Sequence, residues 1–183
     1  MLSDRPSPMG NPAMPATPRR VLHVDDNAGD RRLVSMALSA LGRRVVLHSA
    51  ESGEAALDLL GLGKPAAMAS SSATSAERIS PDVIIVDINM PGMNGFEFVD
   101  TLIRHQNFAN ANILFLSSSR SPADARRAIG LGGSLFAVKP LGYEGLCETL
   151  DIALRSFAGE IELPSSGDVP APGNGEDIII LKS

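Results

Sequence analysis

The sequence has 183 residues, enough for one domain with a substantial buried core but too few for two ordinary domains. It carries 16 Lys and Arg against 21 Asp and Glu, a formal net charge of −5 that argues against a dedicated nucleic-acid-binding protein. No apolar stretch approaches the roughly 20 residues of a membrane-spanning helix, and the N-terminus lacks a signal-peptide pattern. A lone Cys147 cannot form an internal disulfide. We therefore expect a cytoplasmic protein with no nucleic-acid and no membrane partner.

Both ends of the chain differ in composition from the middle. Residues 1–18 contain five prolines and few apolar side chains, so we expect a disordered arm. Residues 159–183 are rich in Gly, Pro, Ser and acidic residues, which is typical of a flexible acidic tail. The apolar run 178–181 in this tail is either a weakly packed end or a peptide that docks by strand addition. The expected domain therefore spans residues 19–158.

Between these ends, short apolar runs alternate with segments of helical period. Strands are expected at 21–24, 45–48, 83–87, 113–116 and 135–138. Helices are expected at 33–41, 52–60, 99–103, from a Ser121 cap onward, and over 146–157. This alternation predicts an α/β domain in which five helices cover both faces of a five-stranded parallel sheet.

Residues 61–80 depart from this alternation with small residues, Gly and Pro. We expect a low-complexity surface insertion there, on the side away from the carboxyl ends of the strands. A partner-binding loop is the alternative interpretation of the same segment.

Polar residues stand at the carboxyl ends of four of the expected strands. Because these ends meet at one edge of a parallel sheet, where ligands bind in such folds, we expect these side chains to converge. Three carboxylates packed together repel one another unless a cation intervenes, and hard oxygen ligands of this kind favour Mg²⁺. The residues are Asp25, Asp26, Asp87, Ser117 and Lys139.

This set of residues also suggests a reaction. With Mg²⁺ bound, an Asp carboxylate can attack a phosphoryl donor to give an aspartyl phosphate, while a Lys neutralises charge on the transferred oxygens. Asp87 is the central candidate because it ends a fully apolar strand and precedes a loop with Pro91 and Gly92. Taken singly, each residue has a simpler explanation as a helix cap, a turn residue or a solvated lysine. Their conjunction at four strand ends favours a site.

The sequence resembles the receiver domain of bacterial response regulators over about residues 19–158, through DD at 25–26, DINMPGMNG at 87–95, LS at 116–117 and KP at 139–140. The resemblance implies a flavodoxin-like, doubly wound parallel sheet of five strands in the order 2-1-3-4-5, with five helices. It implies that Asp87 is the phosphoacceptor and that Lys139 pairs with the phosphoryl group. Asp25, Asp26, Asp87 and the backbone carbonyl of Asn89 would hold Mg²⁺.

The resemblance also implies a switch and two partner surfaces. Ser117 and Phe136 occupy the positions of the hydroxyl and the aromatic ring that respond to phosphorylation. The first helix would meet a histidine kinase or a histidine phosphotransfer protein, with Arg31, Arg32, Leu33 and Met36 as candidate contacts. The fourth helix, fifth strand and fifth helix would form the face for a homodimer or a downstream protein target, with Arg126, Arg127, Phe136 and Tyr143 as its residues.

We therefore expect a single-domain response regulator of two-component signalling, since the roughly 25 residues after Phe157 are too few for an output domain. It would catalyse its own phosphorylation and dephosphorylation without being an enzyme that acts on outside substrates. The segment DDNAGDRRL at 25–33, together with Ser118 and Ser119, resembles the single-domain regulators that accompany bacterial phytochrome kinases more than it resembles chemotaxis regulators.

Three alternatives stay open. The chain could be a phosphoryl shuttle in a phosphorelay, or a scaffold that works without phosphorylation and uses its 178–181 run. An aspartate-nucleophile phosphatase is a third class, but such enzymes resemble a pattern with a second Asp two residues after the nucleophile, where this chain has Asn89.

Overall fold

The computed structural model describes residues 17–63, 78–105, 108, 110–163 and 181–182. In this part of the chain, six strands form one sheet in the order β2-β1-β3-β4-β5-β6. They are Arg19–Val24 (β1), Val45–Ala50 (β2), Val83–Val86 (β3), Asn112–Ser117 (β4), Leu135–Val138 (β5) and Leu181–Lys182 (β6). Strands β1 to β5 run parallel to one another, which confirms the predicted order 2-1-3-4-5.

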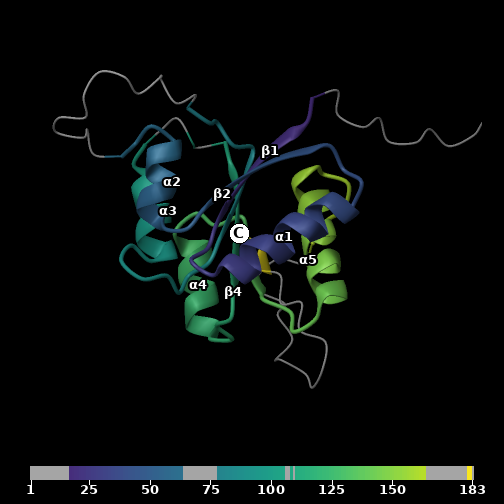
Figure 1. The fold of residues 1–183 in the computed structure, drawn as a ribbon. Coiled ribbons are helices and arrows are strands. Elements are labelled where there is room, and N and C mark those ends of the chain that lie inside the picture. The colour runs from purple at the N-terminus through teal and green to yellow at the C-terminus, as the bar shows by residue number, and fades with distance from the viewer. Residues whose placement is uncertain (1–16, 64–77, 106–107, 109, 164–180, 183) are drawn as a thin grey trace, which may run out of the picture.

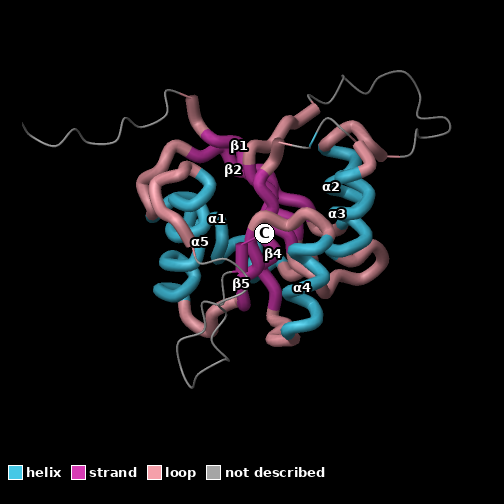
Figure 2. The backbone as a smooth tube through the Cα atoms, turned by 180° about the vertical axis from the view of Figure 1, so that it is seen from behind, coloured by secondary structure: helices cyan, strands magenta, loops and turns pink. Residues whose placement is uncertain are grey.

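Five longer helices connect these strands and cover both faces of the sheet. They are Ala28–Ala40 (α1), Gly53–Leu59 (α2), Gly95–Ile103 (α3), Pro122–Gly130 (α4) and Tyr143–Phe157 (α5). Helices α1 and α5 lie on one face, and α2, α3 and α4 lie on the other (Figure 1), an arrangement that the rear view repeats (Figure 2). None of the described helices has both the length and the apolar character that a bilayer span requires.

The apolar runs form strands because the sheet is buried on both faces. All four residues of β3 are buried, and they alternate between two apolar clusters. Val83 and Ile85 pack toward α1 and α5, whereas Ile84 and Val86 pack toward α2, α3 and α4. A strand covered on both sides is expected to be a continuous apolar run rather than an alternating one.

Local signals fix the ends of the helices near the strand termini. The Asn27 side chain caps α1 by accepting hydrogen bonds from the backbone N–H groups of its first turn, and the helix stops before Gly42, whose φ is 63°. The predicted start of α4 is confirmed, because the Ser121 side chain caps the helix and Pro122 is its first residue.

Strand β6 is an addition to the five-stranded sheet that the sequence predicts. Leu181 pairs with Phe136 and Lys182 pairs with Leu135, so the end of the chain runs antiparallel along the outer edge of β5. The 178–181 run was expected to be either a weakly packed end or an added strand, and at Leu181 the structure shows an added strand. Of the expected tail, residues 164–180 and 183 lie outside the described residues, as do most of the expected arm and residues 64–77 of the expected insertion.

Candidate functional site

The backbone brings the predicted site residues to one edge of the sheet. The parallel hydrogen-bond ladder continues past the ends of the strands, so that the Asp87 N–H donates to the Val24 carbonyl at 2.9 Å. The Lys139 N–H donates likewise to the Ser117 carbonyl at 2.8 Å. These bonds fix the backbone from which the Asp87 and Lys139 side chains project toward each other.

Three carboxylates meet at this edge. Asp25, Asp26 and Asp87 each offer an oxygen atom that lies within 4.8 Å of the other two. Asp25 and Asp87 are buried, whereas Asp26 is exposed. Among the described residues, Oδ1 of Asp87 is buried without a hydrogen-bond partner. A cluster of hard oxygen atoms with an unsatisfied acceptor fits a divalent cation such as Mg²⁺.

The Lys139 ammonium is the cation that balances this cluster in the structure. Its Nζ lies 2.7 Å from Oδ2 of Asp25, 2.8 Å from Oδ2 of Asp30 and 3.1 Å from Oδ2 of Asp87. Burial by itself lowers the pKa of Lys139, but the hydrogen bonds to Asp25 and Asp30 and the nearby charge of Asp87 leave that pKa above its usual value. Lys139 is therefore a permanent positive charge at the site.

Asp30 is a site residue that the sequence interpretation did not include. It lies in the first turn of α1, and its backbone N–H donates to the Asn27 side chain at 3.3 Å. The sequence does carry a weak signal for Asp30, because a carboxylate in the first turn of a helix capped by Asn27 lies close to the strand end at Asp25. An acidic residue in the first turn of a helix is common for helix stability alone, so composition and spacing do not distinguish Asp30 from such a residue.

Asp25 and His23 form a second, deeper layer of the site. Burial raises the pKa of the Asp25 carboxyl, and the hydrogen bond from Lys139 works against this rise. His23 is buried with Nε2 3.8 Å from Oδ2 of Asp25. Burial and the charges of Lys139 and Arg31 lower the pKa of His23 to about 3, so this imidazole is neutral near pH 7 and does not neutralise Asp25.

The loop after β3 lies beside the carboxylates and is shaped by two glycines. Gly92 has a φ of 73°, a conformation that L side chains rarely adopt. A Cβ atom at Gly95 would lie 2.2 Å from the Asp87 carbonyl oxygen, so only glycine lets α3 begin this close to Asp87. Asn89, the expected source of a carbonyl ligand, is exposed in this loop.

An open cavity of about 550 Å³ adjoins the loop and includes Asp26 and Asn89 in its lining. Arg127 also lines it, with its guanidinium 4.2 Å from the centre of the Phe96 ring of α3. Arg127 is an exposed residue of α4, and its guanidinium stacks on the Phe96 ring of α3, while its expected role at a partner surface stays a prediction. The cavity therefore opens beside Asp26, the exposed carboxylate of the cluster.

The expected switch residues lie inside the fold. The Ser117 hydroxyl is buried and accepts a hydrogen bond from the Ser119 N–H at 3.2 Å. Phe136 is 1% exposed in the cluster under α2, α3 and α4. Ser119 orders the loop before α4, since its hydroxyl donates to Asp124 at 2.5 Å.

The other candidate partner residues are distributed over two surfaces. On α1, Arg32 is exposed, and Leu33 and Met36 are 41% and 49% exposed. Arg31 is half-buried and donates to the Asp25 carbonyl at 2.7 Å, so it also supports the site. Arg126 and Tyr143 are exposed on α4 and α5.

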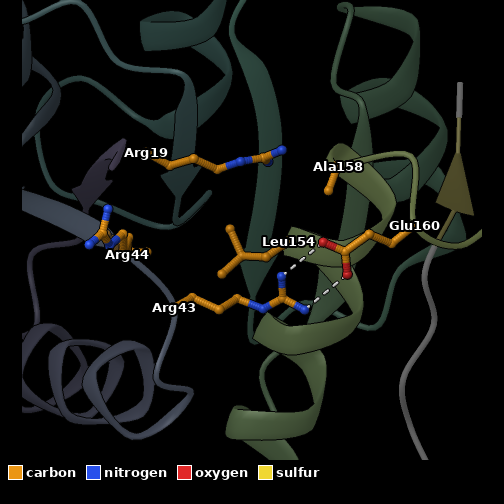
Figure 3. Close-up of a pocket in the computed structure, with 7 residues that line it drawn as sticks. Arg19, Arg43, Arg44, Leu154, Ala158 and Glu160 are labelled. Atoms are coloured by element: carbon orange, nitrogen blue, oxygen red, sulfur yellow. Dashed lines mark hydrogen bonds and ion pairs between the residues drawn. The ribbon is translucent and has the colours of Figure 1, made fainter. Parts of the chain in front are cut away.

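A second, much smaller cavity of about 30 Å³ lies near the starts of β1 and β2, at the amino ends of these strands (Figure 3). Arg43 closes it with a bidentate ion pair to Glu160, at 3.1 and 3.2 Å (Figure 3). This contact attaches the segment after α5 to the loop before β2. It lies at the opposite ends of the strands from Asp87 and takes no part in the site.

Comparison with known proteins gives the same family for sequence and fold. The family model described as "Response regulator receiver domain" matches residues 21–151. Two-component response regulator ARR17 of Arabidopsis thaliana is 36% identical over 121 residues, which cover 66% of this chain and 75% of that protein. A chemotaxis protein CheY homolog of Campylobacter jejuni is 31% identical over 141 residues, 77% of this chain and 96% of that protein.

Solved structures extend the comparison to regulators linked with phytochromes. The bacteriophytochrome response regulator AtBRR superposes with a TM-score of 0.61 at 25% identity, covering 80% of this chain and 97% of that one. A likeness to this group is thus present, but the chemotaxis response regulator CheY4 of Vibrio cholerae superposes with a TM-score of 0.57 at 32% identity, so the comparisons do not rank one group above the other. The matched segment contains all the strand ends that carry the carboxylates, the hydroxyl and the lysine, and the chain belongs to the response regulator receiver domain family of two-component signalling.

Proposed function

We propose that this chain accepts a phosphoryl group from a phosphohistidine donor onto Asp87 and then signals by contact with another protein. The observation that supports the proposal most strongly is that the carboxylates of Asp25, Asp26 and Asp87 meet at one edge of the sheet, beside the ammonium of Lys139. In the transfer, a carboxylate oxygen of Asp87 forms the new O–P bond while the P–N bond of the donor breaks, and the imidazole leaves with the electron pair.

Each neighbouring residue contributes to this step in a different way. Lys139 lies 3.1 Å from Asp87 and carries a fixed positive charge toward the phosphoryl oxygens. Asp25, Asp26, Asp87 and the carbonyl of Asn89 are the groups that would hold Mg²⁺. The ion, when bound, would supply positive charge that offsets repulsion between the carboxylates and the phosphoryl group. Water attack on the aspartyl phosphate would later return Asp87 to its free form.

We propose further that the chain is a switch and not an enzyme that acts on outside substrates. Ser117 would turn its hydroxyl to a phosphoryl oxygen, and Phe136 would respond within β5. These movements would change the surface formed by α4, β5 and α5, and a downstream protein or a second copy of the chain would bind that changed surface. The donor, a histidine kinase or a histidine phosphotransfer protein, would meet the exposed Leu33 and Met36 of α1. We place this exchange in the cytoplasm, in keeping with the free thiol of Cys147.

The test is to incubate the protein with acetyl phosphate and Mg²⁺ and to measure its intact mass. We expect one added phosphoryl group, and none in Asp87→Asn or in the presence of a chelator. Asp100→Asn is the matched control, because Asp100 lies on the adjoining α3 and pairs with Arg104 at the surface. If no adduct forms and beryllium fluoride with Mg²⁺ also fails to bind, the proposed function is wrong. A phosphoryl group that remains in Asp87→Asn would also reject Asp87 as the acceptor.

A further inference from the structure

The three carboxylates that pair with Lys139 would be affected differently when the site binds a cation and a phosphoryl group. A lysine ammonium has three N–H donors, and here they meet Asp25, Asp30 and Asp87 at 2.7, 2.8 and 3.1 Å. Asp25 and Asp87 belong to the cluster that can hold a cation, and Asp87 is also the proposed acceptor. Asp30 belongs to neither group.

This difference matters when the site is loaded. A metal ion that binds Asp25 and Asp87 competes with Lys139 for their oxygens, and a phosphoryl group on Asp87 replaces one of its carboxylate oxygens. Lys139 would then lose two of its three partners. Asp30 is the remaining carboxylate within hydrogen-bond distance of Nζ, at 2.8 Å, and neither the ion nor the phosphoryl group requires it.

Asp30 is also held in place independently of the cation. Its backbone N–H is bound by the Asn27 cap, which fixes the first turn of α1 relative to Asp25. The side chains of Asp30 and Lys139 are 33% and 18% exposed, so their ion pair is only partly screened by solvent. A carboxylate on a capped helix end is a rigid anchor compared with the flexible four-carbon stem of lysine.

We propose that Asp30 is a positioning residue that keeps the Lys139 ammonium directed at Asp87 once the cation and the phosphoryl group occupy the other carboxylates. The inference rests on the proposed function, because it concerns the loaded form of the same site. Asp30 acts through Lys139 and does not itself touch the phosphoryl group.

Simple electrostatics and positioning make opposite predictions for Asp30→Asn. Removing a negative charge near an anion site strengthens anion binding if charge alone matters. If Asp30 positions Lys139, the same substitution weakens anion binding, because the ammonium no longer has an ordered place. The sign of the change therefore separates the two explanations.

The probe is beryllium fluoride, an anionic mimic of the phosphoryl group, titrated at saturating Mg²⁺ into the full chain. We expect Asp30→Asn to weaken its binding by about fivefold, the upper range for a partly exposed ion pair. The matched control is Glu144→Gln, which removes an exposed first-turn acid from α5, and should bind as the unchanged protein does. An Asp30→Asn variant that binds equally well or more tightly would overturn the proposal.

A second measurement follows Lys139 itself. With the mimic bound, we expect the Lys139 ammonium to give the ¹⁵Nζ NMR signal of an ordered group. In Asp30→Asn we expect this ammonium to become mobile, while the backbone amide spectrum remains that of a folded protein. An equally ordered ammonium in the variant would reject the positioning role even if affinity fell. If the unchanged protein fails to bind the mimic, the proposed function fails instead, and the two failures are thereby distinguished.

Discussion

Gly95 lies directly against the backbone of Asp87, so closely that a Cβ atom at Gly95 would be 2.2 Å from the Asp87 carbonyl oxygen. The Gly95 N–H also donates to the Ile88 carbonyl at 3.0 Å, which closes the loop after β3. Helix α3 thus begins at a point fixed by the residue that carries the proposed phosphoryl group.

Gly95→Ala should therefore displace α3 or the Asp87 backbone, since the atoms it meets belong to the backbone and cannot rotate away. We expect the free energy of unfolding to fall by about 1 to 3 kcal/mol and labelling by acetyl phosphate to slow. Urea unfolding and intact-mass kinetics measure the two effects. Gly130→Ala is the control, because a Cβ at Gly130 meets no described atom within 4 Å. Equal stability of the two variants would contradict this account of the loop.

The ion pair between Arg43 and Glu160 should make part of the stability depend on pH. The hydrogen bond from Arg43 lowers the pKa of the Glu160 carboxyl below its usual 4.5. A lowered carboxyl pKa stabilises the fold above the unfolded pKa, and this contribution is lost as pH falls through the folded value. We expect Glu160→Gln to lower the free energy of unfolding at pH 7 by at most about 1 kcal/mol, since both side chains are partly exposed.

The free energies of unfolding of the Glu160→Gln variant and of the unchanged protein should then converge as pH drops below about 4.5. Glu162→Gln is the comparison, because Glu162 is exposed in the same segment. A stability difference that stayed constant from pH 7 to pH 3 would show that Glu160 acts by packing and not by charge.

Strand β6 should protect the edge of β5 from solvent exchange. Its two residues pair with Leu135 and Phe136, and the latter is the expected switch residue. We expect removal of residues 178–183 to speed amide exchange at Leu135 or Phe136 by up to about tenfold, the effect of one lost backbone hydrogen bond. Amides of β2, at the other edge of the sheet, are the internal control. Unchanged exchange at both β5 residues would mean that this pairing does not persist in solution.

The sequence predicted the parallel sheet and the meeting of its polar strand ends because both depend on local apolar runs and on topology. A short run of β-branched apolar residues such as Val83–Val86 is typical of a strand that is buried on both faces of a sheet. The missing parts depend on side-chain direction or on distant pairing. The position of Arg127 in its helix does not show that its guanidinium stacks on the Phe96 ring of α3. Strand addition by the 178–181 run was one of two expectations, but its partner strand β5 lies about 45 residues earlier, and no local pattern around Leu181 identifies that edge.

The charge balance at the site gives the last prediction. Without the Lys139 ammonium, the carboxylates of Asp25, Asp30 and Asp87 face one another with no described cation in hydrogen-bond contact. We expect Lys139→Met to lower the free energy of unfolding at pH 7 by about 3 kcal/mol, as when one partner of a buried ion pair is removed. The pKa of Asp25, already raised by burial, should rise further because the group that opposes this rise is gone.

A raised carboxyl pKa lowers the stability of the fold at high pH. The loss of unfolding free energy in Lys139→Met should therefore shrink as pH falls and Asp25 takes up a proton in the folded protein. Mg²⁺ should also reduce this loss, since it replaces the missing positive charge, and should raise the Tm of the variant more than that of the unchanged protein. Arg104→Met, which removes an exposed ion pair with Asp100, should show no such extra response to Mg²⁺. Equal Mg²⁺ stabilisation of the Lys139→Met variant and the unchanged protein would mean that Lys139 and the metal do not share the same carboxylates.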